Sequence, residues 1–317
     1  MNQGPMKWRE SDTFNPAATL AGDRIAVLFR SEDNTARGIG SRTSRIGYAE
    51  SEDGFHMTFA AEPVLYPAED CNKAYEWPGG CEDPRVAVTE DGLYVMMYTS
   101  WNRDMPRLCV ATSRDLKNWD KHGYAFEDAL GDRNFGGCKS ASVVTEIRDG
   151  RLVIAKPGGK YLMYWGERFV NLATSDDLIH WVPQTDAEGN LVPVMSPRDG
   201  HFDSMLTECG PPAILTDKGI VLMYNGKNRD DERRDERYTA ATYSAGQALF
   251  DRNDPYKLIT RLDEPFFKPE ADFEKTGQYP AGTVFIEGLV LKNGRWFLYY
   301  GCADSFVGVA VCDKSCK

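Results

Sequence analysis

The stretch at residues 23–33, DRIAVLFRSED, sets the architecture of the chain because its pattern recurs four more times. Each copy is a run of hydrophobic and aromatic residues that ends in a polar or aromatic cluster, and a second strand-like run follows it. The first copy leads into SRIGYAESEDGF at 44–55. The later copies are GLYVMMYTSWN (92–102), KYLMYWGE (160–167), GIVLMYNGKN (219–228) and RWFLYYGCAD (295–304).

The spacing of these copies predicts a closed ring of β-sheets. The copies begin roughly 60 to 75 residues apart, which is too long for a solenoid unit and suits a four-stranded propeller blade with a long loop. We therefore expect an all-β fold, a five-bladed β-propeller that forms a single domain over residues 1–317. Each blade delivers its polar cluster at an equivalent place, so one central pocket can collect residues from all five.

Composition and charge narrow the function. The net charge of −11 argues against nucleic-acid binding, because phosphate recognition needs a basic stripe. No run approaches 18 apolar residues, so we expect no membrane span. The N-terminal stretch MNQGPMKWRESDTF lacks the apolar core of a signal peptide, which predicts a cytoplasmic protein or one whose leader has been removed.

The reactive side chains point to acid–base chemistry on carboxylates. Eight cysteines include no C-x-x-C pair and only four histidines are present, so we expect no metal and no cofactor. The 15 Tyr, 15 Phe and 7 Trp suit the faces of sugars, although propeller cores are also rich in aromatic residues. With few histidines, proton transfer would rest on Asp and Glu in apolar or glycine-rich settings, where burial raises a carboxyl pKa.

Three segments carry such carboxylates. GGCEDPRVAV (79–88) places Glu82 and Asp83 just before an expected strand, with Arg85 close behind, and the following proline favours an extended Asp83. LTECGPPAIL (206–215) sets Glu208 among small and apolar residues. FIEGLVL (285–291) sets Glu287 in an otherwise apolar strand, where a lone carboxylate is costly unless it is paired or faces water.

Further charged residues end or follow the repeats. Arg30 and Arg45 are candidate clamps for sugar hydroxyls or carboxylates, and Asp304 ends the fifth run. For these three residues, structural ion pairing is the competing explanation. The same alternative applies to Asp83, which would then be a turn residue paired with Arg85. The motif S-x-D-L-x-x-W occurs at 113–119 and 175–181, and we interpret it as a turn whose Trp fastens an outer strand.

Together these segments resemble glycoside hydrolase family 130. The resemblance rests on FRSED, SRIGYAES, CEDPR, TECGPP, YNGKN, YSAGQALFD, TGQYPAGTVFIEGL and YYGCADS, in that order from about residue 14 to 313. It implies a five-bladed propeller that acts on β-mannosides, with Asp83 as a proton donor working through a sugar hydroxyl. The family's hydrolase branch has glutamates matching Glu208 and Glu287. We expect sugar contacts from Arg30, Arg45, Glu82, Arg85, Lys139, Asn225, Tyr243, Tyr279 and Asp304.

One position separates the two branches of that family. Its phosphorylases usually carry a histidine in Y-H-G, whereas the matching segment here reads Tyr224-Asn225-Gly226. The resemblance therefore favours an inverting β-mannosidase whose partner is a mannose-containing oligosaccharide, most simply a β-1,2-linked one. Two alternatives stay open. One is a phosphorylase whose phosphate is held by cations, drawn from Arg30, Arg45, Arg85 and Lys139. The other is a glycan-binding propeller without catalysis.

Overall fold

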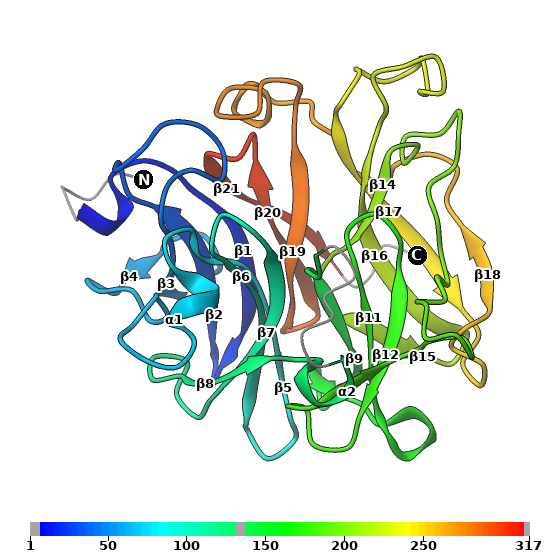
Figure 1. Cartoon of the computed structure of the whole chain (residues 1–317), viewed down its shortest axis with the longest axis horizontal. Helices are drawn as coiled ribbons and strands as arrows, with labels where there is room; N and C mark the ends of the chain where they lie inside the picture. Colours follow the sequence, from blue (N-terminus) through cyan, green and yellow to red (C-terminus); the bar gives the residue numbers. More distant parts are fainter. Residues whose placement is uncertain (1–6, 131–136, 314–317) are drawn as a thin grey trace.

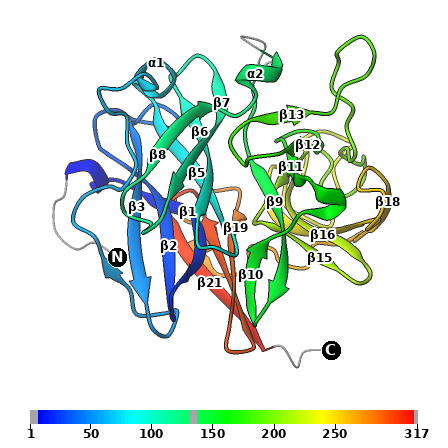
Figure 2. The same ribbon diagram turned by 90° about the horizontal axis from the view of Figure 1, so that it is seen from below.

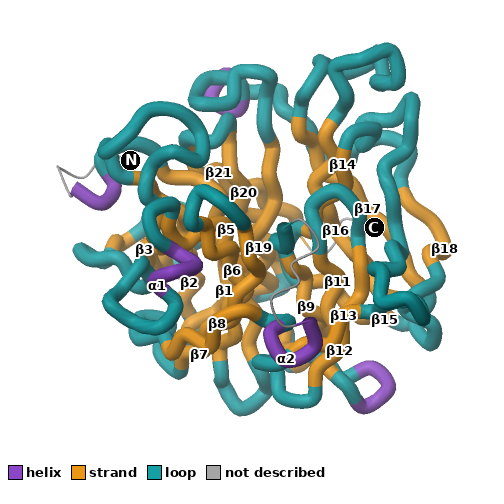
Figure 3. Tube along the Cα trace, viewed as in Figure 1, coloured by secondary structure: helices purple, strands orange, loops and turns teal. Residues whose placement is uncertain are grey.

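The computed structural model describes residues 7–130 and 137–313, and β-strands dominate it (Figures 1 and 3). The all-β prediction is confirmed. Helices are short: α1 (Lys73–Glu76), α2 (Glu127–Leu130), and the 3-10 turns at Lys7–Arg9, Pro157–Gly159 and Asp272–Glu274. Within the described ranges no helix is long and apolar enough to cross a membrane.

The strands of the described residues form three sheets. The first contains β1 (Thr13–Ala21), β2 (Arg24–Glu32), β3 (Ser44–Ser51), β4 (Thr58–Phe59), β5 (Gly80–Val88), β6 (Tyr94–Trp101), β7 (Pro106–Ser113) and β8 (Asp120–Tyr124). The second contains β9 (Ala141–Arg148), β10 (Arg151–Ile154), β11 (Tyr161–Trp165), β12 (Asn171–Ser175), β13 (Trp181–Pro183), β14 (Leu206–Cys209), β15 (Ala213–Thr216), β16 (Gly219–Lys227), β17 (Tyr243–Phe250) and β18 (Leu258–Arg261). The third contains β19 (Val284–Lys292), β20 (Arg295–Cys302) and β21 (Phe306–Asp313).

Each of the five sequence repeats is one antiparallel hairpin. The hairpins are β2–β3, β6–β7, β11–β12, β16–β17 and β20–β21. A further strand precedes each hairpin and pairs with its first strand, for example β1 with β2 and β19 with β20. The hydrophobic runs are continuous because these strands are covered on both faces; every residue of β2 after Arg24 is buried.

The hydrophobic core is divided among the junctions between neighbouring hairpin units. Separate clusters join the unit of β1–β3 to that of β5–β7, the latter to β9–β12, and these to β15–β17. Two smaller clusters join β17 to β19–β20, and β19–β20 back to β1–β2. The last hairpin unit therefore packs against the first, which closes the series of units. The third sheet, β19–β21, lies between the first and second sheets (Figures 1 and 2).

The S-x-D-L-x-x-W motifs are structural, as the sequence predicted. In both copies the Ser hydroxyl accepts a hydrogen bond from the Leu amide, and the Leu has a left-handed backbone. The Trp119 indole then donates to the Leu116 carbonyl at 3.0 Å, and the Trp181 indole donates to that of Leu178 at 3.1 Å. Each motif thus fixes the turn that leads into the outer strand of its sheet.

Candidate active site

Three of the site residues project from irregular points in strands that begin the hairpin units. The strand register shifts at Asn15 in β1, after Glu82 in β5 and at Glu287 in β19. A β-bulge leaves a residue unpaired and redirects its side chain. Asp83 lies in such an interruption with φ of 46°. The expectation that the following proline would hold Asp83 extended, ahead of the strand, is therefore wrong, because the bulge within β5 imposes a left-handed backbone.

Asp83 is held as an anion. Its Oδ1 accepts hydrogen bonds from Asn15 Nδ2 at 2.8 Å and from Arg30 Nη1 at 3.0 Å. Burial by itself would raise the pKa of Asp83, but the positive charges of Arg30, Lys139 and Arg85 and the bond from Asn15 outweigh it and hold that pKa below its ordinary value. The free protein therefore carries an ionised Asp83 at neutral pH.

Arg30 gathers three carboxylates. Besides Asp83, its Nη2 lies 2.7 Å from Glu32 and 2.9 Å from Glu82, and its Nε donates to Ser44 at 3.1 Å. Burial, and then repulsion from Asp83 and Glu32, raise the pKa of Glu82 to about 7, although Arg30 opposes the change. The cluster thus pairs an ionised aspartate with a neighbouring glutamate that takes up a proton near neutrality.

Arg85 links the other two candidate carboxylates. Its Nη1 lies 2.8 Å from Glu287 Oε1 and its guanidinium 4.0 Å from Glu208 Oε1, while it donates to the carbonyls of Asp83 and Cys209 at 2.9 Å. Both glutamates are buried. Burial raises the pKa of Glu208 to about 7 and that of Glu287 well above its ordinary value, against the attraction of nearby cations.

The carboxyl of Glu287 has hydrogen-bonding capacity to spare. Although it forms an ion pair with Arg85, neither oxygen makes a well-directed hydrogen bond to any described residue. Glu208 differs, because the Ser140 hydroxyl donates to its Oε1 and Lys139 Nζ lies 3.5 Å away. A buried carboxyl without directed partners is costly unless a water molecule or ligand hydroxyl reaches it.

Two further predicted residues border this cluster. Lys139 lies between Glu167, at 3.2 Å, and Glu208, and these carboxylates with Asp83 raise its pKa despite burial. Asp304 has a left-handed backbone, φ 51°, at the turn between β20 and β21. Burial, followed by the charges of Asp83 and Glu32, raises the pKa of Asp304 to about 6.

An aromatic pair borders the cluster on the side of β17. The rings of Tyr243 and Tyr279 meet edge to face at 5.5 Å, and Lys227 Nζ lies within 5.3 Å of both ring centres. Burial, and then the charge of Glu208, raise the pKa of Tyr243, so its hydroxyl stays protonated at neutral pH. Such a pair offers an apolar face beside charged groups.

The structure separates two predicted residues from the direct cluster. Arg45 points away from Arg30, because adjacent strand positions face opposite sides of a sheet; it bonds to Asp33 at 3.0 Å and lines a different groove. Asn225 is fully buried, and both ends of its amide bond to the backbone of Ile286. Neither side chain joins the carboxylates around Arg30 and Arg85.

Several neighbours were not singled out from the sequence. Glu32, Ser44, Asn15 and Ser140 supply bonds to the cluster. Glu32 and Ser44 lie in the quoted segments FRSED and SRIGYAES, whereas Asn15 and Ser140 lie in no quoted segment. Asn15 and Ser140 have left-handed backbones, with φ of 46° and 59°. Backbone strain of this kind gathers at functional sites but cannot be seen in a sequence.

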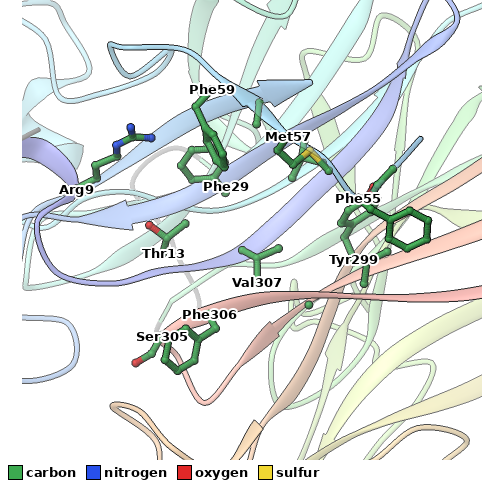
Figure 4. A pocket seen from close by; sticks show the side chains of 15 residues that line it. Arg9, Thr13, Phe29, Phe55, Met57, Phe59, Tyr299, Ser305, Phe306 and Val307 are labelled. Carbon is green, nitrogen blue, oxygen red and sulfur yellow. The ribbon is translucent and has the colours of Figure 1, made fainter. Parts of the chain in front are cut away.

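An apolar cavity of about 150 Å³ lies elsewhere, beside β2 and β21. Figure 4 shows Phe29, Phe59, Met57 and Val307 around it, with Arg9 and Thr13 at one side. None of Asp83, Glu208 and Glu287 lines it. We therefore place the chemistry at the carboxylate cluster, where titratable groups with shifted pKa values converge.

In this all-β arrangement of packed hairpins, irregular strand positions bring several carboxylates together around Arg30 and Arg85. The chain belongs to glycoside hydrolase family 130: the family model described as beta-1,4-mannooligosaccharide phosphorylase matches residues 3–315.

Known relatives fall on both sides of the family. A 1,2-beta-oligomannan phosphorylase of Thermoanaerobacter sp. (strain X514) is 31% identical over 98% of this chain and 93% of its own length. A solved glycosyl hydrolase from Bacteroides ovatus is 63% identical, with a TM-score of 0.94, over 96% of this chain and 85% of that one. Another structure, 61% identical with a TM-score of 0.94 over 96% and 85%, is described in terms of family 130 mannoside phosphorylases containing glycoside hydrolases that target beta-1,2 mannosidic linkages in Candida mannan.

Proposed function

We propose that this protein is an inverting glycoside hydrolase that cleaves β-mannosides, with β-1,2-linked mannooligosaccharides as substrates. The observation that carries the proposal is the convergence of two buried glutamates, Glu208 and Glu287, on one guanidinium, that of Arg85. Carboxylates can orient and deprotonate a water molecule, whereas they repel a phosphate dianion. The solved relative at 63% identity is described as a glycosyl hydrolase, and the one at 61% is described in terms of family 130 hydrolases that target beta-1,2 mannosidic linkages, whereas the phosphorylase relative shares 31%.

Asp83 is the proposed proton donor, acting through a sugar hydroxyl. Its pKa is low in the free protein, so the donating form has to arise in the complex. A bound sugar excludes water and strengthens the desolvation that already opposes the charge on Asp83. The proton then passes from Asp83 to the hydroxyl while the hydroxyl proton passes to the leaving oxygen, and the departing sugar is released neutral.

Glu208 or Glu287 is the proposed base on the opposite face of the sugar. The base removes a proton from water as the oxygen attacks the anomeric carbon, and the glycosidic bond breaks with inversion. Glu208 is the better suited to this step, because a pKa of about 7 allows it to be ionised and still basic near neutral pH. Glu287, with Arg85, then orients the water.

The surrounding polar groups are proposed to hold the sugar. Glu82, Arg30, Lys139 and Asp304 border the carboxylates and present hydrogen-bonding groups of both signs. Tyr243 and Tyr279 supply an apolar face on one side. We also interpret the five hairpin units, whose cores connect in a closed order, as the five blades of one propeller domain with this cluster at its centre.

Phosphorolysis is the second candidate, because the curated relative at 31% identity is a phosphorylase. Incubation of the protein with β-1,2-mannobiose, with and without phosphate, separates the possibilities. A hydrolase releases only mannose under both conditions. Mannose 1-phosphate that accumulates only with phosphate would replace the hydrolase by a phosphorylase, and no product under either condition would favour a glycan-binding protein.

A further inference from the structure

Asn225 connects the strands that carry the two glutamates. In the register of β14 and β16, its backbone lies opposite Glu208. Its side chain reaches β19, where Oδ1 accepts a hydrogen bond from the Ile286 N–H at 2.7 Å and Nδ2 donates to the Ile286 carbonyl at 3.1 Å. Ile286 immediately precedes Glu287. One buried residue therefore lies opposite Glu208 in the sheet and holds, through its side chain, the residue that precedes Glu287.

The two hydrogen bonds from Asn225 to Ile286 matter because they lie next to the bulge in β19. Ile286 pairs with Tyr300 and Gly288 with Tyr299, which leaves Glu287 as the extra residue without a partner on β20. A bulged residue has lost the ladder bonds that usually fix its direction. By accepting from the N–H and donating to the carbonyl of Ile286, the Asn225 amide takes the place of a strand partner immediately before the bulge.

The side chain of Glu287 needs that support. Its carboxyl is fully buried, its ion pair with Arg85 at 2.8 Å is not a well-directed hydrogen bond, and no described residue donates to either oxygen. The ion pair with Arg85 is the one polar contact that the carboxyl makes among the described residues. The direction of Glu287 therefore depends also on its backbone, which Asn225 holds through Ile286.

We propose that Asn225 is a positioning residue for catalysis: it fixes the Glu287 backbone relative to Glu208, so that both carboxyls address the same water molecule. This inference rests on the hydrolytic function proposed above. It assigns Asn225 a role in turnover through Glu287, in place of the sugar contact expected from the sequence.

The test compares Asn225→Ala with a matched control, Asn171→Ala. Asn171 is also a buried asparagine, and its amide donates to the backbone carbonyls of Trp165 and Phe169. The measurements are mannose release from β-1,2-mannobiose in phosphate-free buffer, melting temperature, and the pH profile of kcat/KM. Asn225→Asp, which keeps the acceptor and the shape of the side chain, is the second variant if Asn225→Ala does not fold.

For Asn225→Ala we expect kcat to fall about 100-fold, the scale of an ångström's misplacement of a catalytic group, with KM changed less than about threefold. The rising limb of its pH profile should also move, since Glu208 and Glu287 no longer share one geometry. Asn171→Ala should keep kcat and the profile even with an equal loss of melting temperature. Asn225→Asp should fall between wild type and Asn225→Ala.

Either of two results would overturn this inference and leave the proposed hydrolysis standing. One is a kcat for Asn225→Ala within about threefold of the wild type. The other is an equal loss of kcat in Asn171→Ala when the two variants have the same melting temperature. A wild-type protein that releases no mannose without phosphate would instead refute the proposed hydrolysis, and the positioning of a water-activating base would be refuted with it.

Discussion

Replacement of Glu208 by Gln should remove activity and yet stabilise the protein above neutral pH. Glu208 is buried, and burial raises its pKa from 4.5 to about 7. Gln has nearly the same shape, stays neutral and can still accept the hydrogen bond from Ser140 through its amide oxygen. The substitution therefore removes a charge that the folded protein disfavours, together with the group that we propose deprotonates water.

The magnitude follows from linkage. The folded protein binds the Glu208 proton more tightly than the unfolded chain does, so the free energy of unfolding falls as pH rises from about 4.5 to about 7. A rise of that size in the pKa of Glu208 lowers the free energy of unfolding by at most about 3 kcal/mol. Near pH 5 Glu208→Gln should match the wild type, and near pH 8 it should be more stable by up to about 3 kcal/mol.

Chemical denaturation at both pH values, together with mannose release, measures the two effects. We expect turnover to fall at least about 100-fold. Glu90→Gln is a suitable control, because its side chain is 70% exposed, and it should change stability by less than about 0.5 kcal/mol at either pH. A Glu208→Gln protein that is no more stable than the wild type at pH 8, or that retains turnover, would refute the reasoning.

Further predictions concern the same cluster. Asp83→Asn should keep the fold and reduce turnover of unactivated mannosides about 100-fold in steady-state assays; near-normal turnover would remove Asp83 as donor. Glu287→Gln should nearly abolish mannose release, and a variant of near wild-type rate would leave only Glu208 as base. For the wild type, kcat/KM should rise with pH through about 7 as Glu208 ionises, and a flat profile there would contradict its role as base.

The hairpins could be predicted because the residues of one continuous segment determine each of them. Within Arg24–Glu32, residues 25–29 are all apolar, and such a continuous run indicates a strand covered on both faces. The S-x-D-L-x-x-W turns are equally local, since every bond in them joins residues within three positions. The hairpins and these turns could therefore be predicted, whereas the conformation expected for Asp83 from its neighbouring proline could not, because a bulge decides it.

The arrangement of the site depends on how the strands pair with one another, and this strand register involves residues far apart in the sequence. Arg30 and Arg45 looked equivalent in the sequence, but Arg30 lies opposite Ile46 and Arg45 opposite Ser31, so the two side chains leave the sheet on opposite faces. In the same way, the bulge that redirects Asp83 exists only in the pairing of β5 with β6. The sequence identified the residue types of the site, whereas the strand pairing selects which of them meet.

The charges of the cluster bear on the choice between water and phosphate. Among the described residues, its cations already face carboxylates: Arg30 with Glu32, Glu82 and Asp83; Arg85 with Glu208 and Glu287; Lys139 with Glu167 and Glu208. Like unit charges 4 Å apart repel by about 4 kcal/mol at an effective dielectric constant of about 20, and phosphate carries up to two charges. A phosphate ion that approached Arg85 or Lys139 would come close to Glu208, and the ionised form of Glu208 would repel it. Water meets no such repulsion, and in the function that we propose Glu208 and Glu287 are the groups that activate it.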